Sequence, residues 1–229
     1  MYRLFIANKN YSSWSLRPWL LLSALGIAFE ERLELFQPGS NRARFRSFSP
    51  AGTVPCLHDD GVVVWDSLAI IEYLAERHAG VWPADPVARA WARCACAEMH
   101  AGFSTLRNVC SMSVGLRVRL HEQSPALLGE LARIDELWCE GVTRHGGPWL
   151  GGASFGAVDA FFAPVVFRVQ TYGLPLSPAA QAWLARMLAL PAMQQWTRAA
   201  LAETARDEGH EQDTLAVGTV LEDLRAAAV

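Results

Sequence analysis

Residues 10–18, with the sequence NYSSWSLRP, connect a short apolar run to a helical pattern near the amino terminus. The run at residues 4–6 predicts a strand. Residues 15–25 predict a helix that ends at Gly26, because glycine commonly closes helices. Three hydroxyl groups therefore lie between the predicted strand and the first turn of the helix. They belong to Ser12, Ser13 and Ser15.

Strand and helix patterns continue to alternate downstream of this unit. Residues 29–36 alternate apolar and charged side chains, which predicts a second strand. Residues 55–58 and 62–65 are β-rich runs around an Asp-Gly turn, which indicates a hairpin. Residues 68–74 have apolar side chains at helical spacing. The predicted order of strand, helix, strand, hairpin and helix makes a small α/β domain over residues 1–80.

A Pro-rich linker at residues 80–86 leads into a part of the chain with almost wholly helical patterns. We therefore expect an all-helical domain over residues 87–229. Its tail from residue 207 has only a weak helical stretch, which either packs or frays. The predicted helices cover residues 87–116, 124–145, 156–170, 178–188 and 192–206.

The composition excludes several classes of protein. With 229 residues and 52% hydrophobic residues, the chain can bury a proper core and is not intrinsically disordered. Its 20 basic and 23 acidic residues argue against binding of nucleic acid, which usually requires a basic patch. The five cysteines lack paired C-x-x-C spacing and predict neither a disulfide framework nor a metal site. No apolar run is long enough for a membrane helix or a signal peptide, so we expect a cytoplasmic protein without a membrane partner.

The three serines suit the binding of an anion. The amino terminus of a helix has unpaired N–H groups and the positive end of the helix dipole, and a hydroxyl there can donate a hydrogen bond. The dipole also lowers the pKa of an adjacent thiol. The alternative is ordinary N-capping, for which serine is favoured whatever the function.

Two further segments are candidates for binding. Thr53-Val54-Pro55 precedes a predicted strand, where proline is commonly found. A cis Val54–Pro55 bond would expose the N–H and C=O of Val54 to a peptide-like ligand, although trans bonds predominate in folded proteins. Asp66 and Ser67 precede a predicted helix and could hold the ammonium and carboxylate of an amino acid. N-capping is again the alternative.

Residues 11–17, 53–55 and 66–74 together resemble the motifs of cytosolic glutathione S-transferases, in order and in separation. The resemblance covers essentially the whole chain. It implies a thioredoxin-like N-terminal domain followed by an all-helical C-terminal domain, with glutathione as cosubstrate. It also implies that Pro55 is cis and that Val54 binds the cysteinyl backbone of glutathione. Asp66 and Ser67 would hold the γ-glutamyl group, with Thr53 as a weaker contact.

Residues 12–17, SSWSLR, resemble the Ser-Ser-Cys-x-x-Arg motif of the zeta class. This match implies that Ser12 lies beside the glutathione sulfur and stabilises its thiolate, with Ser13 and Ser15 as the other candidates. Trp14 occupies the position of the motif's cysteine, which weakens an assignment to maleylacetoacetate isomerisation.

Residues 155–159, FGAVD, resemble the N-capping box of the same family, although Gly156 occupies the Ser/Thr position. Asp159 can still bond back to the chain, as the logic of a capping box requires. We expect this segment to be a folding element and not a functional site.

The pocket for the electrophile is expected between the two domains, along the predicted long helix. Arg107 and Asn108 would orient a polar or anionic cosubstrate there. In the alternative, Phe103 and Met112 are core residues and Arg107 is a solvated charge. The candidate pocket residues are His100, Phe103, Ser104, Arg107, Asn108 and Met112.

The expected function is that of a glutathione transferase, in which the thiolate attacks a small hydrophobic electrophile, as in detoxification. One alternative is a glutathione-dependent isomerase or reductive dehalogenase, which a requirement for a cysteine such as Cys56 or Cys110 would favour. The other is a non-enzymatic binding module that interacts through its helical domain. The resemblance also implies a homodimer.

Overall fold

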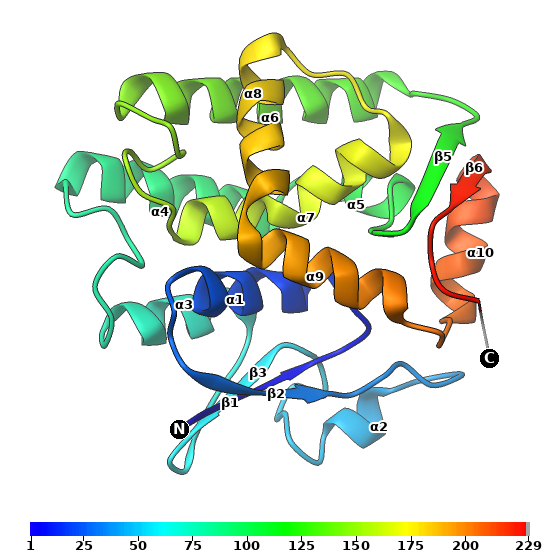
Figure 1. Ribbon diagram of the computed structural model, residues 1–229, viewed down its shortest axis with the longest axis horizontal. Coiled ribbons are helices and arrows are strands. Elements are labelled where there is room, and N and C mark those ends of the chain that lie inside the picture. Colours follow the sequence, from blue (N-terminus) through cyan, green and yellow to red (C-terminus); the bar gives the residue numbers. More distant parts are fainter. Residues whose placement is uncertain (228–229) are drawn as a thin grey trace.

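The computed structural model describes residues 1–227. Its first part contains a four-stranded mixed sheet in the order β2-β1-β3-β4 (Figure 1). Strand β1 runs parallel to β2 and antiparallel to β3, and β3 pairs with β4 as a hairpin. The strands are β1 (Tyr2–Ile6), β2 (Phe29–Leu33), β3 (Cys56–Asp59) and β4 (Val62–Val64). The element order is the one that the residue patterns predict, and the arrangement is the thioredoxin-like one that the family resemblance implies.

Helices pack on this sheet where the apolar patterns predict them. Both α1 (Ser13–Ala24) and α3 (Ser67–Ala75) lie between the sheet and the helices of the second part of the chain in Figure 1. The short helix α2 (Arg42–Phe45) was not predicted, because its four residues are too few to produce a periodic pattern.

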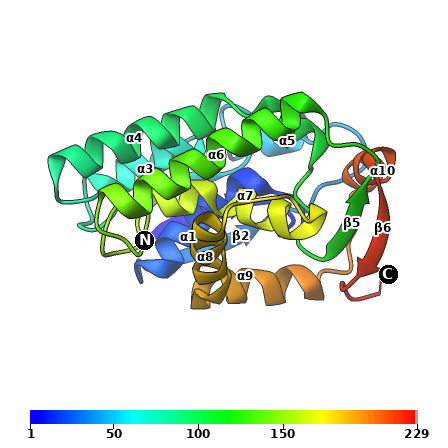
Figure 2. The ribbon, with the colours of Figure 1, turned by 90° about the horizontal axis from the view of Figure 1, so that it is seen from above.

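The second part of the chain, predicted to be all-helical, is mostly helical and packs on α1 (Figures 1 and 2). No helix among residues 1–227 has the length and apolar character needed to cross a membrane. The helices of the second part are α4 (Pro86–Ala101), α5 (Ser104–Val109), α6 (Pro125–Arg144), α7 (Ala157–Tyr172), α8 (Pro178–Ala189), α9 (Pro191–Ala202) and α10 (Glu208–Val217).

The predicted continuous helix over residues 87–116 is wrong. Helix α4 ends at Ala101, and Phe103 adopts a left-handed backbone conformation with φ 55° before α5 begins. The chain then forms β5 (Leu116–Leu120), whose LRVRL sequence alternates apolar and charged residues as a strand does. The second part is therefore not all-helical, since β5 pairs with β6 (Gly218–Asp223).

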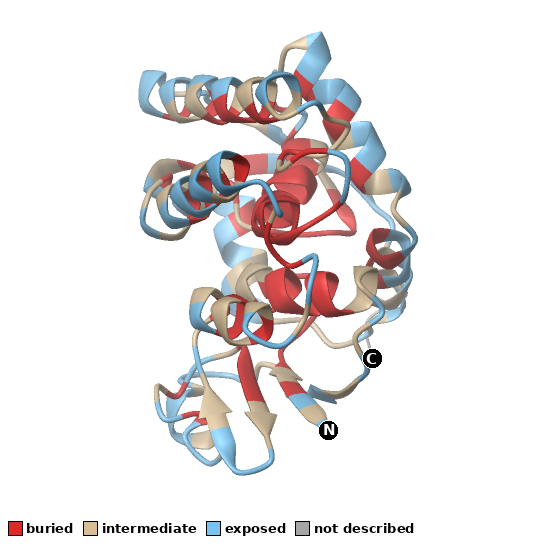
Figure 3. Ribbon diagram, turned by 90° about the vertical axis from the view of Figure 1, so that its left-hand side faces the viewer, coloured by how far each residue is buried: buried red, intermediate tan, exposed pale blue. Residues whose placement is uncertain are grey.

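Helix α7 is the buried centre of the molecule, and it packs against both α1 and α4 (Figure 3). Its start is held by the Asp159 carboxylate, which accepts hydrogen bonds from the N–H of Gly156 (3.0 Å) and of Leu150 (3.0 Å). The indole N–H of Trp183 donates a third bond (3.1 Å). The prediction that Asp159 bonds back to the chain as a folding element is therefore confirmed.

Candidate functional site

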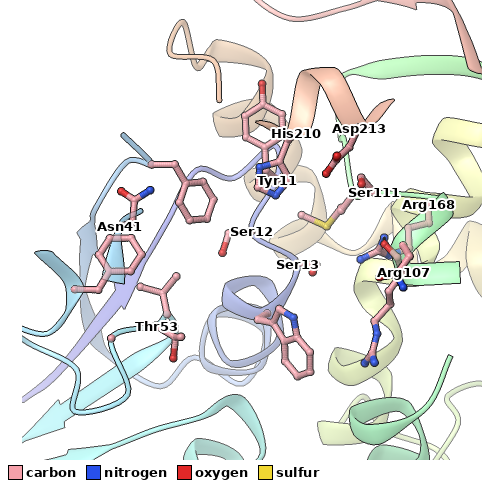
Figure 4. A pocket seen from close by; sticks show the side chains of 17 residues that line it. Tyr11, Ser12, Ser13, Asn41, Thr53, Arg107, Ser111, Arg168, His210 and Asp213 are labelled. Atoms are coloured by element: carbon pink, nitrogen blue, oxygen red, sulfur yellow. Dashed lines mark hydrogen bonds between the residues drawn. The ribbon is translucent and has the colours of Figure 1, made fainter. Parts of the chain in front are cut away.

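A cavity of about 720 Å³ lies between the loop that precedes α1 and the helices α5, α7 and α10 (Figure 4). This volume is typical of small-molecule sites. Both polar and aromatic side chains line it, and they come from segments far apart in the sequence. The lining residues are Tyr11, Ser12, Ser13, Trp14, Phe36, Asn41, Phe45, Gly52, Thr53, Val54, Arg107, Asn108, Ser111, Met112, Arg168, His210 and Asp213.

The structure places the three candidate serines differently. Ser12 and Ser13 line the cavity, whereas Ser15 is fully buried beneath them and does not. Ser12 stands at the N-cap position of α1, but its side chain makes no capping hydrogen bond. Its Oγ lies 2.7 Å from the Oγ of Ser15 instead. The capping alternative therefore does not describe Ser12.

Ser15 supports the Ser12 hydroxyl from below. The Ser15 Oγ accepts a hydrogen bond from the N–H of Ala7 (3.3 Å) at the end of β1. When the Ser15 hydroxyl donates to Ser12, the Ser12 proton is left to donate into the cavity. Chains of hydrogen bonds of this kind polarise one another. The arrangement can therefore stabilise an anionic atom placed beside Ser12.

The neighbouring Tyr11 does not offer a second hydroxyl to that atom. Its OH donates to the Glu211 carboxylate (2.7 Å) and accepts from Arg225 (3.0 Å), both in the carboxy-terminal segment. Burial, together with the hydrogen bond to Glu211, raises the pKa of Tyr11. The tyrosine side chain therefore ties the tail to the serine loop.

The loop before β3 has the geometry that the family resemblance implies. The Val54–Pro55 bond is cis, so the interpretation of Pro55 as an ordinary trans proline is wrong. Thr53 and Val54 line the cavity, whereas Pro55 does not. Within residues 1–227, the N–H and C=O of Val54 make no hydrogen bond to another residue. Gly52 is required beside them, because a Cβ there would lie 2.8 Å from the Arg42 carbonyl oxygen.

Asp66 and Ser67 lie outside this cavity. The Asp66 carboxylate caps α3 by accepting from the N–H of Leu68 (3.1 Å), so the capping alternative holds for this residue. Its second oxygen lies 3.5 Å from the Nε2 of His100, and both residues line a separate hollow. Ser67 is buried and accepts from Arg17 (3.5 Å).

The residues predicted for the electrophile pocket are divided between two places. Arg107, Asn108 and Met112 line the cavity. His100 instead meets Asp66 and the edge of Trp14, with ring centroids 5.2 Å apart. Phe103 and Ser104 do not line the cavity, and Phe103 is a buried core residue. The division follows from the break after α4, which turns α5 toward the serines.

Sequence reasoning missed several lining residues. His210 and Asp213 come from α10, in a tail whose weak pattern gave no signal for a site. His210 stacks on Tyr11 and on Phe36, with centroids 5.0 and 5.4 Å away. Arg168 could have been found, because it is the one basic residue in a helix that is strongly apolar after Asp159. The other lining residues that were not predicted as site residues are Tyr11, Trp14, Phe36, Asn41, Phe45, Gly52 and Ser111.

No cysteine lines the cavity. Cys56 and Cys110 are buried, and burial raises the pKa of Cys56 to about 11 and that of Cys110 to about 12. Both side chains are therefore thiols at neutral pH and not nucleophilic thiolates. Within residues 1–227, no group of three or more His, Cys, Asp or Glu side chains is arranged to hold a metal ion.

Comparison with known proteins gives consistent results. Residues 11–77 match the family described as "Glutathione S-transferase, N-terminal domain". The chain is 28% identical over 179 residues to a probable maleylacetoacetate isomerase of Caenorhabditis elegans, which covers 74% of this chain and 79% of that protein. It is 26% identical over 209 residues to glutathione S-transferase GstB of Escherichia coli K12, which covers 82% of this chain and 94% of that protein.

The fold has solved counterparts as well. A crystal structure of a glutathione transferase homologue from Burkholderia gl BGR1, with bound glutathione, has a TM-score of 0.62 at 25% identity. The match covers 86% of this chain and 96% of that chain. The family match spans the serine loop, the cis-proline turn and α3, which are the elements that carry the resemblance in the sequence. Residues 11–77 therefore belong to the family of glutathione S-transferase N-terminal domains, and the chain as a whole has the fold of a glutathione transferase homologue.

Proposed function

We propose that this protein is a glutathione transferase in which the Ser12 hydroxyl stabilises the glutathione thiolate. The observation that carries the proposal is the Ser12–Ser15 pair at the start of α1, with an Oγ–Oγ distance of 2.7 Å. The Ser12 side chain is not used as a helix cap and faces a cavity large enough for a tripeptide. The positive end of the α1 dipole acts in the same direction, because it also favours an anion there.

The chemistry requires only a modest shift in the thiol pKa. A free cysteine thiol has a pKa near 8.5, and each unit of lowering corresponds to about 1.4 kcal/mol. A lowering of roughly two units would make bound glutathione mostly thiolate at neutral pH. A hydrogen bond to a charged group contributes about 1.5–3 kcal/mol, so one serine and the helix end suffice. The thiolate then attacks the electrophilic carbon of the second substrate.

The same proposal assigns the remaining glutathione contacts. The free N–H and C=O of Val54 would pair with the cysteinyl backbone, as neighbouring strands do, and Thr53 would lie at the edge of that contact. Asp66 and Ser67 would hold the γ-glutamyl group from outside the main cavity. The oxygen of Asp66 that does not cap α3 would accept from the ligand's ammonium.

A glutathione-dependent isomerase is the second candidate, which the likeness to a probable maleylacetoacetate isomerase favours. An isomerase of this kind returns glutathione unchanged, whereas a transferase consumes it. Measuring free thiol during turnover therefore separates the two. The buried positions of Cys56 and Cys110 favour neither a cysteine-dependent isomerase nor a reductive dehalogenase.

The proposed function is tested by Ser12→Ala with Ser13→Ala and Ser15→Ala as companions. We expect Ser12→Ala to lower kcat while the affinity for glutathione, measured by calorimetry, changes little. Ser15→Ala should have a smaller effect of the same kind, because it removes only the support. Full activity in all three variants would reject the serine mechanism, and absence of glutathione binding by the unaltered protein would favour a binding module.

We also propose that the protein is a cytoplasmic homodimer. Its five cysteines are free, which fits a reducing compartment. Trp65 is 43% exposed beside Asp66, and aromatic residues are enriched at protein–protein interfaces. Sedimentation at micromolar concentration should give twice the monomer mass, and a monomer would contradict this assignment.

A further inference from the structure

Two arginines form the wall of the cavity that faces the serines. Arg107 belongs to α5 and Arg168 to α7, and both line the cavity. In Figure 4 they lie on one side of Ser12 and Ser13, while Thr53 and Asn41 lie on the other. A thiolate held at Ser12 would therefore stand between the proposed glutathione contacts and the arginines.

Neither arginine has a carboxylate partner among residues 1–227. The Nη1 of Arg107 donates to the carbonyl oxygens of Met99 (3.4 Å) and His100 (3.0 Å). The Nη1 of Arg168 donates to the carbonyl oxygens of Arg107 (3.4 Å) and Cys110. The Nε and Nη2 atoms of both side chains donate to no residue within that range, and none of them is fully enclosed by protein. These nitrogens are free to bind a ligand.

A third arginine, Arg17, also lacks a carboxylate ion-pair partner among residues 1–227. Arg17 is buried with its guanidinium over the rings of Trp14 (4.1 Å) and Phe161 (4.6 Å). Burial, and the nearby charges of Arg107 and Arg168, lower the pKa of Arg17 to about 9, which still leaves it protonated at neutral pH. Buried charges are normally paired, so three cations grouped beside one cavity create a site for an anion.

Other charged groups that face the cavity do not cancel this potential. Asp213 of α10 lines the same cavity, yet it makes no ion pair with either Arg107 or Arg168. By contrast, Arg225 outside the cavity is held by the carboxylates of Glu211 and Asp223 at 2.6 and 2.8 Å. Arg225 thus has two carboxylate partners, whereas Arg107 and Arg168 have no carboxylate partner among residues 1–227.

We propose that the second substrate carries a carboxylate, which Arg107 and Arg168 bind while the thiolate at Ser12 attacks the electrophilic carbon. The planar guanidinium matches a carboxylate in geometry and in hydrogen-bond donors. This proposal rests on the proposed transferase function. It narrows the expected polar or anionic cosubstrate at Arg107 to a carboxylate, and it adds Arg168 as the second residue that binds it. A carboxylate on the side of the substrate away from the reacting carbon would anchor it without entering the reaction.

A matched pair of chloroarenes tests this preference. The probes are 4-chloro-3-nitrobenzoate and neutral 1-chloro-2,4-dinitrobenzene, in which a nitro group replaces the carboxylate. In both, the glutathione sulfur forms a bond to the ring carbon that bears chlorine. The C–Cl bond then breaks, chloride leaves with the electron pair, and the thiol proton passes to the solvent. The measured quantity is the ratio of kcat/KM for the benzoate to kcat/KM for the neutral probe.

We expect Arg107→Met to lower this ratio at least tenfold and Arg107→Lys to lower it less, because one charge-assisted hydrogen bond typically accounts for such a factor. Asp213→Asn should raise the ratio, because it removes the one carboxylate among the residues that line the cavity. Arg186→Met is the matched control, because Arg186 is exposed, donates to the Pro148 carbonyl and does not line the cavity. Its ratio should equal that of the unaltered protein.

The outcomes separate this proposal from the function on which it rests. A ratio that does not change in Arg107→Met, with both probes still turned over, overturns the carboxylate site and leaves the transferase intact. A rise in the KM of glutathione by the same factor with both probes would assign the arginines to glutathione itself and overturn the proposal. If the unaltered protein binds glutathione but turns over neither probe, the transferase function fails and the carboxylate site fails with it.

Discussion

The two walls of the cavity are built in different ways. The serine wall comprises Ser12, Ser13 and the Thr53-Val54 backbone. It offers short side chains and backbone groups that are held by the sheet and by the start of α1. The arginine wall consists of long side chains that reach in from α5 and α7 (Figure 4). The Ser12 hydroxyl is hydrogen-bonded to that of Ser15, whereas Arg107 and Arg168 have only carbonyl partners among residues 1–227.

This difference indicates how the two walls divide the chemistry. Groups fixed by the backbone suit a sulfur that must take one position in every turnover. Side chains that bind through charge suit a substrate whose shape varies but whose anionic group is constant. Variants in the serine wall should therefore affect all electrophiles equally, and variants in the arginine wall should change the choice among them.

The largest effect is expected where the arginine wall is supported. Asp159 holds the start of α7, the helix that carries Arg168, through three buried N–H groups. Asp159→Ala leaves these donors without a partner and should lower the free energy of unfolding by about 3 kcal/mol, measured by urea titration. Glu136→Gln, on the exposed face of α6, is the control and should change stability by less than about 0.5 kcal/mol. A loss as small as the control's would mean that α7 does not depend on this carboxylate.

Asp159 also predicts a pH dependence of stability. Burial raises its pKa to about 6, although the three N–H donors act against that shift. Because the folded chain holds this proton more tightly than the unfolded chain, whose Asp pKa is about 3.9, the group stabilises the fold most below about pH 4. That contribution is lost as the pH rises through about 6. The free energy of unfolding is measured as a function of pH for the unaltered protein and for Asp159→Asn. The difference between the two profiles gives the contribution of Asp159, and parallel profiles would contradict this prediction.

In the serine wall, Ser12→Ala should lower kcat by about 10- to 100-fold, the value of one hydrogen bond to an anion. The factor should be the same for a neutral and for an acidic electrophile, because Ser12 contacts the sulfur and not the second substrate. Steady-state kinetics with both probes measures it. A factor that differs strongly between the probes would mean that the two walls do not act separately.

The smallest effect concerns the tail that closes the cavity. Arg225 joins Glu211 of α10 to Tyr11 of the serine loop. Arg225→Met should cost about 1–2 kcal/mol and speed amide hydrogen exchange in α10 and β6 more than in α7. Arg144→Met, which breaks an exposed ion pair with Glu140, should have almost no effect. Equal exchange rates in the two variants would remove any role for the Arg225 contacts.

The serine wall and the first domain could be predicted from the sequence because their signals are local. Alternating residues mark the strands, and Ser12 and Val54 lie within a few residues of the element that positions them. The cis bond at Pro55 could not be derived from the residues, because trans is the usual state, and only the family resemblance implied it.

The arginine wall could be predicted only in part because it depends on packing. Arg107 was identified, but the break at Phe103 that turns α5 toward the serines leaves no clear pattern in the sequence. Arg168 comes from a helix more than 50 residues further along the chain, and its approach to Arg107 follows from α7 packing at the centre of the molecule. The position of α10 depends on contacts such as that between Tyr11 and Glu211, which periodicity does not reveal.

The central claim is that the Ser12 hydroxyl keeps the glutathione sulfur anionic. Ultraviolet absorbance of the thiolate, followed as a function of pH in the complex with glutathione, measures this directly. We expect a thiol pKa roughly two units below that of free glutathione in the unaltered protein, and a pKa close to the free value in Ser12→Ala. The same pKa in both proteins, with glutathione bound in each, would contradict the account.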